Sequence, residues 1–218
     1  MQSLLNPESL PFLIELAIAL GSPLCVLDLE TTGYGNHESG IVQIGMLTIG
    51  LDGRQAFMNV LVNPRKRINP FATRVHGLTF EDVRHSPEFK TFAPRILMVM
   101  HDHVLCGYNS SSCDIPVLRN NLAQLSDAPF MPKHLDVRKL WINISRAQKG
   151  KLTEVAARYG VTPGQAHDAM GDVLTTARLL DSMIGQHGMN WVLEQYESMK
   201  PQVLSDQGDA VTTDVPCT

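Results

Sequence analysis

Hydrophobic positions recur along the chain with two different spacings, and these predict an order of strands and helices. Short apolar runs typical of strands occupy residues 24–29, 41–49, 56–62, 104–108 and 134–137. Apolar residues at helical spacing occupy residues 7–20, 87–100, 115–125, 152–159, 166–184 and 191–199. The first three strands are consecutive, and the later strands alternate with helices. This order predicts one α/β domain that opens with a three-stranded meander.

Length and composition agree with a single large domain. The chain has 218 residues, of which 44% are hydrophobic, and this is enough to bury a core without stabilising disulfides. We assign residues 1–22 to an N-terminal helix and residues 23–200 to the domain. Residues 201–218 are mostly small and polar and show no periodicity, so we expect a disordered tail there.

The N-terminal region and the cysteines favour a cytoplasmic location. The apolar stretch 10–20 is interrupted by Glu15 and no basic residue precedes it, which argues against a signal peptide or a membrane span. The four cysteines show no Cys-x-x-Cys spacing, a pattern that favours reduced thiols.

The net charge of −4 conceals a strong segregation of charge along the chain. Residues 1–53 contain no Lys or Arg and six acidic residues. Residues 54–151 contain fifteen basic and seven acidic residues, whereas residues 152–218 contain three basic and nine acidic residues. A basic middle segment between acidic ends is compatible with an anionic partner, although the total charge is negative.

Acidic residues occur in three places that are unusual for solvated surface charges. Asp28 and Glu30 end an apolar strand, and residues at i and i+2 of a strand point to the same face. Asp114 lies near the start of a predicted helix, where an acidic residue often acts as a cap. Asp168 and Asp172 are i and i+4 neighbours on another predicted helix. Each place alone has a structural explanation as a solvated strand end, a cap or a first-turn acid.

Taken together, the acidic positions predict a metal site. Carboxylates without cysteine ligands suit Mg²⁺ or Mn²⁺, and two such ions stabilise the attacking and leaving oxygens of a phosphoryl displacement. His167 lies beside the last acidic pair, and a histidine is suited to take a proton from the attacking water. The residues therefore indicate metal-dependent phosphodiester hydrolysis.

Five short segments carry a family resemblance in the same order: residues 28–33, 41–45, 75–79, 107–114 and 167–172. The set resembles the DEDD superfamily of 3′–5′ exonucleases, in its DEDDh (DnaQ-like) branch, over residues 24–186. The resemblance implies an RNase H-like α/β fold with a mixed five-stranded sheet flanked by helices. Cys113 and the spacing from Asn109 to Asp114 depart from the common pattern. Gly-Tyr-Asn at 107–109 with this longer spacing resembles bacterial exonuclease I, as does His-Asp-Ala-Met at 167–170 followed by an Asp.

The resemblance also implies roles for individual residues. Two divalent cations, Mg²⁺ or Mn²⁺, are expected on Asp28, Glu30, Asp114 and Asp172, with His167 as the general base. Substrate binding is expected from Thr31, Thr32, Gly33, His76, Tyr108 and Asn109, with backbone groups of residues 31–33 facing the terminal nucleotide. Asp168 is not a ligand in this interpretation.

The interpretation that we favour is a 3′–5′ exonuclease that releases nucleoside 5′-monophosphates from single-stranded 3′ ends. The local likeness to exonuclease I favours DNA as the substrate. Basic residues at 65–67, Arg74 and a cluster over residues 138–151 are then expected to line a strand channel.

Three alternative functions remain open from the sequence: an RNA-trimming exoribonuclease, a polymerase proofreading subunit and a non-catalytic nucleic-acid-binding module. No membrane partner is expected. A homodimer or a polymerase or repair protein is left open as the protein partner.

Overall fold

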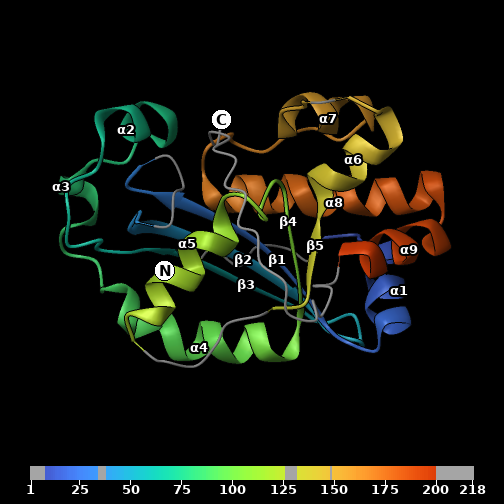
Figure 1. The fold of residues 1–218 in the computed structure, drawn as a ribbon, viewed down its shortest axis with the longest axis horizontal. Coiled ribbons are helices and arrows are strands. Elements are labelled where there is room, and N and C mark those ends of the chain that lie inside the picture. Colours follow the sequence, from blue (N-terminus) through green and yellow to red (C-terminus); the bar gives the residue numbers. More distant parts are fainter. Residues whose placement is uncertain (1–7, 34–37, 126–131, 148, 200–218) are drawn as a thin grey trace, which may run out of the picture.

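A mixed sheet lies at the centre of the computed structural model, which describes residues 8–33, 38–125, 132–147 and 149–199. Within these residues, five strands follow the order β3-β2-β1-β4-β5 (Figure 1). Their bounds are β1 (Leu24–Thr31), β2 (Ile41–Ile49), β3 (Gln55–Leu61), β4 (Val104–Gly107) and β5 (His134–Asp136). β1, β2 and β3 pair antiparallel, whereas β4 is parallel to both β1 and β5. The predicted meander and the mixed five-stranded sheet are both confirmed.

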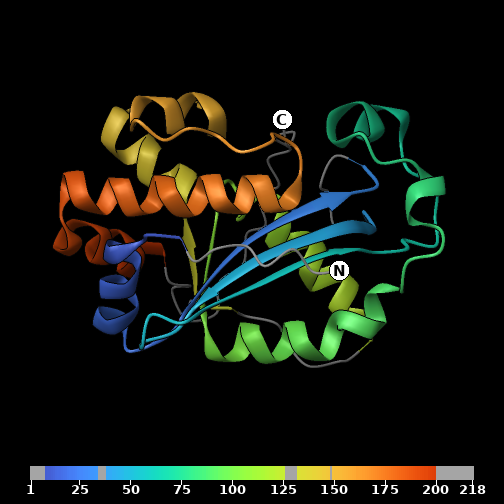
Figure 2. The same ribbon diagram turned by 180° about the vertical axis from the view of Figure 1, so that it is seen from behind.

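Helices cover both faces of the sheet. Their bounds are α1 (Pro11–Leu20), α2 (Pro70–His76), α3 (Phe80–Val83), α4 (Phe89–Asp102), α5 (Asp114–Ala123), α6 (Val137–Ser145), α7 (Leu152–Arg158), α8 (Ala169–His187) and α9 (Met189–Met199). Figure 2 shows α8 and α4 on opposite sides of the sheet. One core cluster joins the sheet to α1, α8 and α9, and a second joins it to α4 and α5.

The alternation of side chains along β1 decides which face receives the acidic pair. Leu24 and Val26 belong to the core cluster on the α8 side, whereas Cys25 and Leu27 belong to the cluster on the α4 side. Because the side chains of a strand alternate, Asp28 and its i+2 neighbour Glu30 point toward α8. The hydrophobic pattern of the strand therefore directs both carboxylates to the face where α8 begins.

Three helices lie outside the elements that the sequence predicted. α2 begins at a proline, and the Asn69 side chain caps it by accepting from Phe71 N. α3 has only four residues, and α6 starts directly after β5, where a longer strand was expected. α8 begins at Ala169 and not at 166, because His167 has a positive φ of 60° and cannot continue a helix.

The hydropathy of the helices and the state of the cysteines can be compared with what the sequence predicted. In the described part of the chain, no helix has both the length and the hydropathy that a membrane span requires. Cys25 and Cys106 are free and buried, as expected. Cys113 is disulfide-bonded, so the expectation of reduced thiols is wrong at this position. The expected tail, 201–218, lies outside the described residues.

Gly45 of β2 allows α8 to approach the sheet at its first residue. A Cβ atom on Gly45 would lie 2.6 Å from the backbone carbon and oxygen of Ala169. Gly45 is also the register partner of Asp28. The glycine thus sets the distance between the start of α8 and the strand that carries the acidic pair.

We predict that Gly45→Ala destabilises the protein by about 1–3 kcal/mol, because a backbone segment of α8 must move away from the sheet. Urea denaturation of the variant and the parent chain would measure the change. Thr48→Ala, on the same strand and half-exposed, is the matched control and should change stability by less than about 0.5 kcal/mol. Equal stability of Gly45→Ala and the parent would show that the close contact does not constrain α8.

Candidate active site

Four carboxylates from three elements meet at the end of β1. The carboxylate oxygens of Asp28, Glu30 and Asp172 lie within 4.8 Å of one another. Asp114, the first residue of α5, accepts a hydrogen bond from Leu29 N at 3.0 Å through Oδ1, which holds it against the same strand. All four line one cavity of about 500 Å³. The structure therefore brings together the four acids that the sequence singled out.

Burial is the main cause of unusual protonation in this cluster. It raises the pKa of Glu30 to about 8, with further contributions from Asp172 and Asp114. Burial likewise raises the pKa of Asp114 to about 7, against the opposing hydrogen bond from Leu29 N. The pKa of Asp28 lies well above its usual range because of burial first and then Asp114 and Glu30. The cluster therefore disfavours its own ionised state.

The same cluster fits a divalent cation. Among the ion pairs of the described residues, none involves any of the four acids, so no Lys or Arg side chain there pairs with them. Carboxylate oxygens are the ligands that Mg²⁺ and Mn²⁺ prefer. A bound cation would offset both the burial and the repulsion that raise these pKa values. The donor set and its spacing are therefore suited to a metal site, as the sequence predicted.

Hydrogen bonds from β2 fix the start of α8. Asp168 caps the helix by accepting from Gly171 N at 3.0 Å, and its other oxygen accepts from Gln43 Nε2 at 2.9 Å. Gln43 Oε1 in turn accepts from Ala169 N at 3.4 Å. These bonds occupy the carboxylate of Asp168, which agrees with a capping residue, and they hold Asp172 one turn further along the helix.

His167 lies on the rim of the cavity, immediately before α8. Its side chain is exposed, and its backbone N donates to Asp172 Oδ2 at 3.2 Å. The positive φ of 60° is uncommon for a residue with a side chain, and such conformations cluster at functional sites. The imidazole is thus placed next to the acids and open to a molecule that enters the cavity.

Residues 31–33, at the end of β1 and just after it, differ in whether they line the cavity. Thr31 and Gly33 line it, and Thr31 Oγ1 donates to Gly33 O at 3.0 Å. Thr32 does not line it: the side chain is buried and accepts from Gly40 N at 3.0 Å. Of the residues expected to contact substrate, Thr32 is the one that the structure keeps away from the cavity surface.

His76, at the end of α2, lines the cavity with both ring nitrogens engaged. Leu78 N donates to Nδ1 at 3.1 Å, so the proton is on Nε2, which lies 3.1 Å from the carbonyl oxygen of Thr31. Burial lowers the pKa of His76, which agrees with a neutral ring. The geometry makes His76 a support for the Thr31 peptide.

Tyr108 and Asn109 line the opposite wall, and their polar groups also bind protein. Tyr108 donates its hydroxyl to Gly150 O at 2.8 Å. Asn109 N donates to Asp136 Oδ1 at 3.0 Å, and Asn109 has a positive φ of 59°. Figures 1 and 2 show the two sides of this region. α2 lies near the end of β1, whereas α6 and α7 lie alongside α8, on the other side of its N-terminal end.

Two residues that support the site were missed from the sequence: Gln43 and Asp136 act through hydrogen bonds to loops. Arg138 and Lys151, from the basic cluster expected to line a strand channel, belong to the cavity lining, and so does Phe71. Asp136 had a usable signal, since an Asp that follows a strand and precedes amphipathic spacing is typical of a helix cap. The role of Gln43 at the start of α8 had none, because its partners there lie 125 and 126 residues away in the sequence.

Comparisons with known proteins agree with this site. A sequence model of the exonuclease family matches residues 25–180. The DNA polymerase III subunit epsilon of Treponema pallidum is 26% identical over 164 residues, which span 73% of this chain and 75% of that protein.

Solved structures show the same fold. Escherichia coli exonuclease I in complex with a dA16 oligonucleotide superposes with a TM-score of 0.65 at 17% identity, over 79% of this chain and 42% of that chain. Exonuclease X in complex with 5′-overhanging duplex DNA superposes with a TM-score of 0.62 at 23% identity, over 80% of this chain and 98% of that chain. The chain thus spans less than half of exonuclease I, and the shared part is the RNase H-like α/β fold. The family match over residues 25–180, with the likeness in sequence and fold, shows that the chain belongs to the exonuclease family as a 3′–5′ exonuclease of the DEDD superfamily.

Proposed function

We propose that this protein hydrolyses phosphodiester bonds at single-stranded DNA 3′ ends and releases nucleoside 5′-monophosphates with the help of two divalent cations. The observation that carries the proposal is the convergence of Asp28, Glu30, Asp114 and Asp172 beside His167 in one cavity. Two buried and two half-buried acids without a Lys or Arg ion-pair partner among the described residues are costly to ionise, and a pair of cations is the partner that their chemistry fits.

The residues have distinct parts in this proposal. Asp28, Glu30, Asp114 and Asp172 hold Mg²⁺ or Mn²⁺, which supplies Lewis-acid stabilisation of the attacking and leaving oxygens when bound. His167 accepts the proton of the attacking water, since its ring is exposed on the cavity rim.

Substrate contacts follow from the cavity lining. Thr31 and Gly33 offer backbone groups to the terminal nucleotide. Thr32 holds their loop through its bond from Gly40 N. His76 holds the Thr31 peptide in place, so it acts on the substrate through the backbone. Tyr108 offers the face of its ring, because its hydroxyl is bound to Gly150 O.

DNA is favoured as the substrate because exonuclease I and exonuclease X, two of the neighbours in fold, were solved with DNA bound. A second candidate is a proofreading subunit of a polymerase, which the likeness to a polymerase III subunit epsilon favours. A pull-down of a replicative polymerase by the full chain, and its loss when residues 200–218 are deleted, would support that second candidate.

We expect pure protein to release nucleotides from a 3′-labelled single strand in Mg²⁺ or Mn²⁺ and to release none in chelator. Asp28→Asn should lower the rate roughly 100-fold or more, because it removes a charged metal ligand. Asp102→Asn, on an exposed residue at the end of α4, is the matched control and should keep full activity. Binding without release by the parent chain would contradict the proposal, and faster release from matched RNA would move the substrate class to RNA.

We expect His167→Ala to lower kcat by about 10²–10⁴-fold with KM nearly unchanged, because it removes proton transfer and leaves the acids in place. Steady-state kinetics on a single-stranded oligonucleotide would measure both constants. The control is His85→Ala, an exposed histidine between α3 and α4. A kcat like that of the parent chain would remove His167 from the reaction.

The raised pKa values predict how metal and pH act on stability. An acid whose pKa is higher in the folded state contributes stability that is complete below about pH 4 and is lost as pH rises through its folded value. With folded values of about 7 for Asp114 and about 8 for Glu30, the melting temperature in chelator should fall between pH 5 and 8.5. Mn²⁺ should restore it, most strongly at the upper end.

Thermal melts of the parent chain and of Asp28→Asn/Glu30→Gln would check this dependence. The double variant carries two fewer buried charges, so its melting temperature in chelator should fall less with pH and respond less to Mn²⁺. If the melting temperatures of the two proteins changed with pH by the same amount, the acids would not be a source of the pH dependence.

A further inference from the structure

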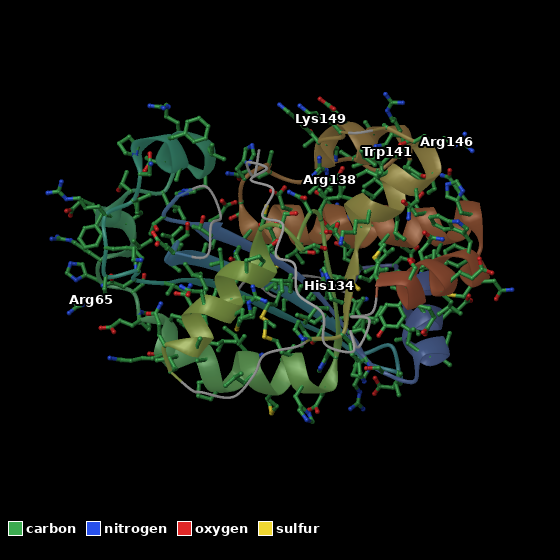
Figure 3. All side chains as sticks on the ribbon, in the orientation of Figure 1. Arg65, His134, Arg138, Trp141, Arg146 and Lys149 are labelled. Carbon is green, nitrogen blue, oxygen red and sulfur yellow. The ribbon has the colours of Figure 1, made fainter. Side chains whose placement is uncertain are left out.

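Arg138 is a basic residue in the cavity that the four acids line. It lies in the first turn of α6, is half-buried and belongs to the same cavity lining as the four acids. Figure 3 shows it at the start of α6, toward the middle of the molecule, whereas Arg65 lies at the left edge. We propose that Arg138 binds the phosphate group one nucleotide upstream of the scissile phosphate, so that the preferred substrates are oligonucleotides with at least two phosphodiester groups.

Hydrogen bonds hold the Arg138 side chain in one orientation. Asp136 Oδ1 accepts from the backbone N atoms of both Arg138 and Asn109 at 3.0 Å. Arg138 Nη1 then donates to Asn109 Oδ1 at 2.8 Å, and Asn109 Nδ2 donates to Cys113 Sγ at 3.1 Å. The amide of Asn109 is thereby fixed with its oxygen toward the guanidinium. A pre-oriented guanidinium loses little conformational entropy when it binds an anion.

Most of the donors of Arg138 remain available. A guanidinium carries five N–H groups, and the bond to Asn109 uses one of them. Among the described residues, no carboxylate forms an ion pair with Arg138, whereas Arg65, Arg84 and Arg178 each pair with a glutamate. Bidentate recognition of a phosphate is the interaction that a free, planar guanidinium in a cavity fits best.

The position of Arg138 favours an upstream phosphate over the scissile one. The four acids lie at the end of β1 and in the first turns of α5 and α8, whereas Arg138 lies in the first turn of α6. Arg138 Nη1 bonds the side chain of Asn109, and the neighbouring Tyr108 bonds Gly150 O, so Arg138 lies on the wall that these residues form. The phosphate assigned to Arg138 is therefore the one next to the phosphate that the acids would hold through cations.

The direction of the strand follows from the two walls. The loop proposed for the terminal nucleotide lies on the α2 side, where His76 Nε2 bonds Thr31 O and Asn69 N bonds Thr32 O at 2.8 Å. A strand whose end lies there must leave the cavity toward α6 and α7. Lys151, which also lines the cavity at the start of α7, adds a second positive charge along this path.

This inference rests on the proposed function, and two substrates test it separately. The p-nitrophenyl ester of thymidine 5′-monophosphate has a single phosphodiester group, whereas a single-stranded hexanucleotide has upstream phosphates. Arg138→Gln should lower kcat/KM on the hexanucleotide by roughly 10–100-fold, the range for a charge-assisted hydrogen bond, and leave the ester within about twofold. Arg138→Lys should give an intermediate kcat/KM on the hexanucleotide, because an ammonium group keeps the charge but cannot bind a phosphate with two parallel hydrogen bonds.

Salt dependence gives a second measurement. The slope of log(1/KM) against log salt for the hexanucleotide should fall by about 0.7 in Arg138→Gln, since one phosphate contact is lost. Arg95→Gln, on the exposed side of α4 across the sheet, is the matched control and should change neither the rates nor the slope.

Each other outcome contradicts a specific statement. An equal loss on both substrates would show that Arg138 supports the structure or contacts the scissile phosphate, and no loss on either would show that it binds no phosphate. A parent chain that cleaves neither substrate would overturn the proposed function, and this inference with it.

Discussion

The convergence of four carboxylates, two of them buried and two half-buried, is the constraint on which the rest of the structure depends. Burial and mutual repulsion raise the pKa values of Asp28, Glu30 and Asp114, and no basic side chain of the described residues pairs with them. Such a cluster persists only where rigid elements hold it. The sheet and α8 provide this rigidity, and a contact between backbone atoms of α8 and Gly45 sets their separation.

The polar side chains that support the site bond groups other than the carboxylates that would hold a cation. Gln43 binds the capping carboxylate of Asp168 and not the ligand carboxylates, and Asp136 binds the backbone of the loop before α5. Backbone N–H groups also hold one oxygen each of Asp114 and Asp172. The scaffold thus orients the acids through neutral donors, which do not cancel the charge that attracts a cation.

The sequence predicted the part of the site that depends on local periodicity. Asp28 and Glu30 share a face because a strand alternates, and Asp172 follows a helix start that His167 and Asp168 mark. The parts that it missed depend on contacts between distant segments. Nothing near Arg138 indicates that an amide 29 residues earlier orients it, and α6 itself was missed because its short apolar spacing directly follows a strand. Thr32 was assigned to the substrate with its neighbours, and only the tertiary contact with Gly40 shows that its side chain faces the protein.

The charge pattern of the chain acquires a spatial meaning in this fold. The acidic N-terminal segment supplies Asp28 and Glu30, and the acidic C-terminal segment supplies Asp172, so two distant acidic regions meet at one end of the cavity. The basic middle segment supplies Arg138 and Lys151 on the opposite wall. A cavity that is acidic at one end and basic at the other distinguishes two kinds of phosphate: the acids reach a phosphate only through cations, whereas the basic residues bind one directly. A strand with its terminal phosphodiester at the acids and the next phosphate at Arg138 would satisfy both walls.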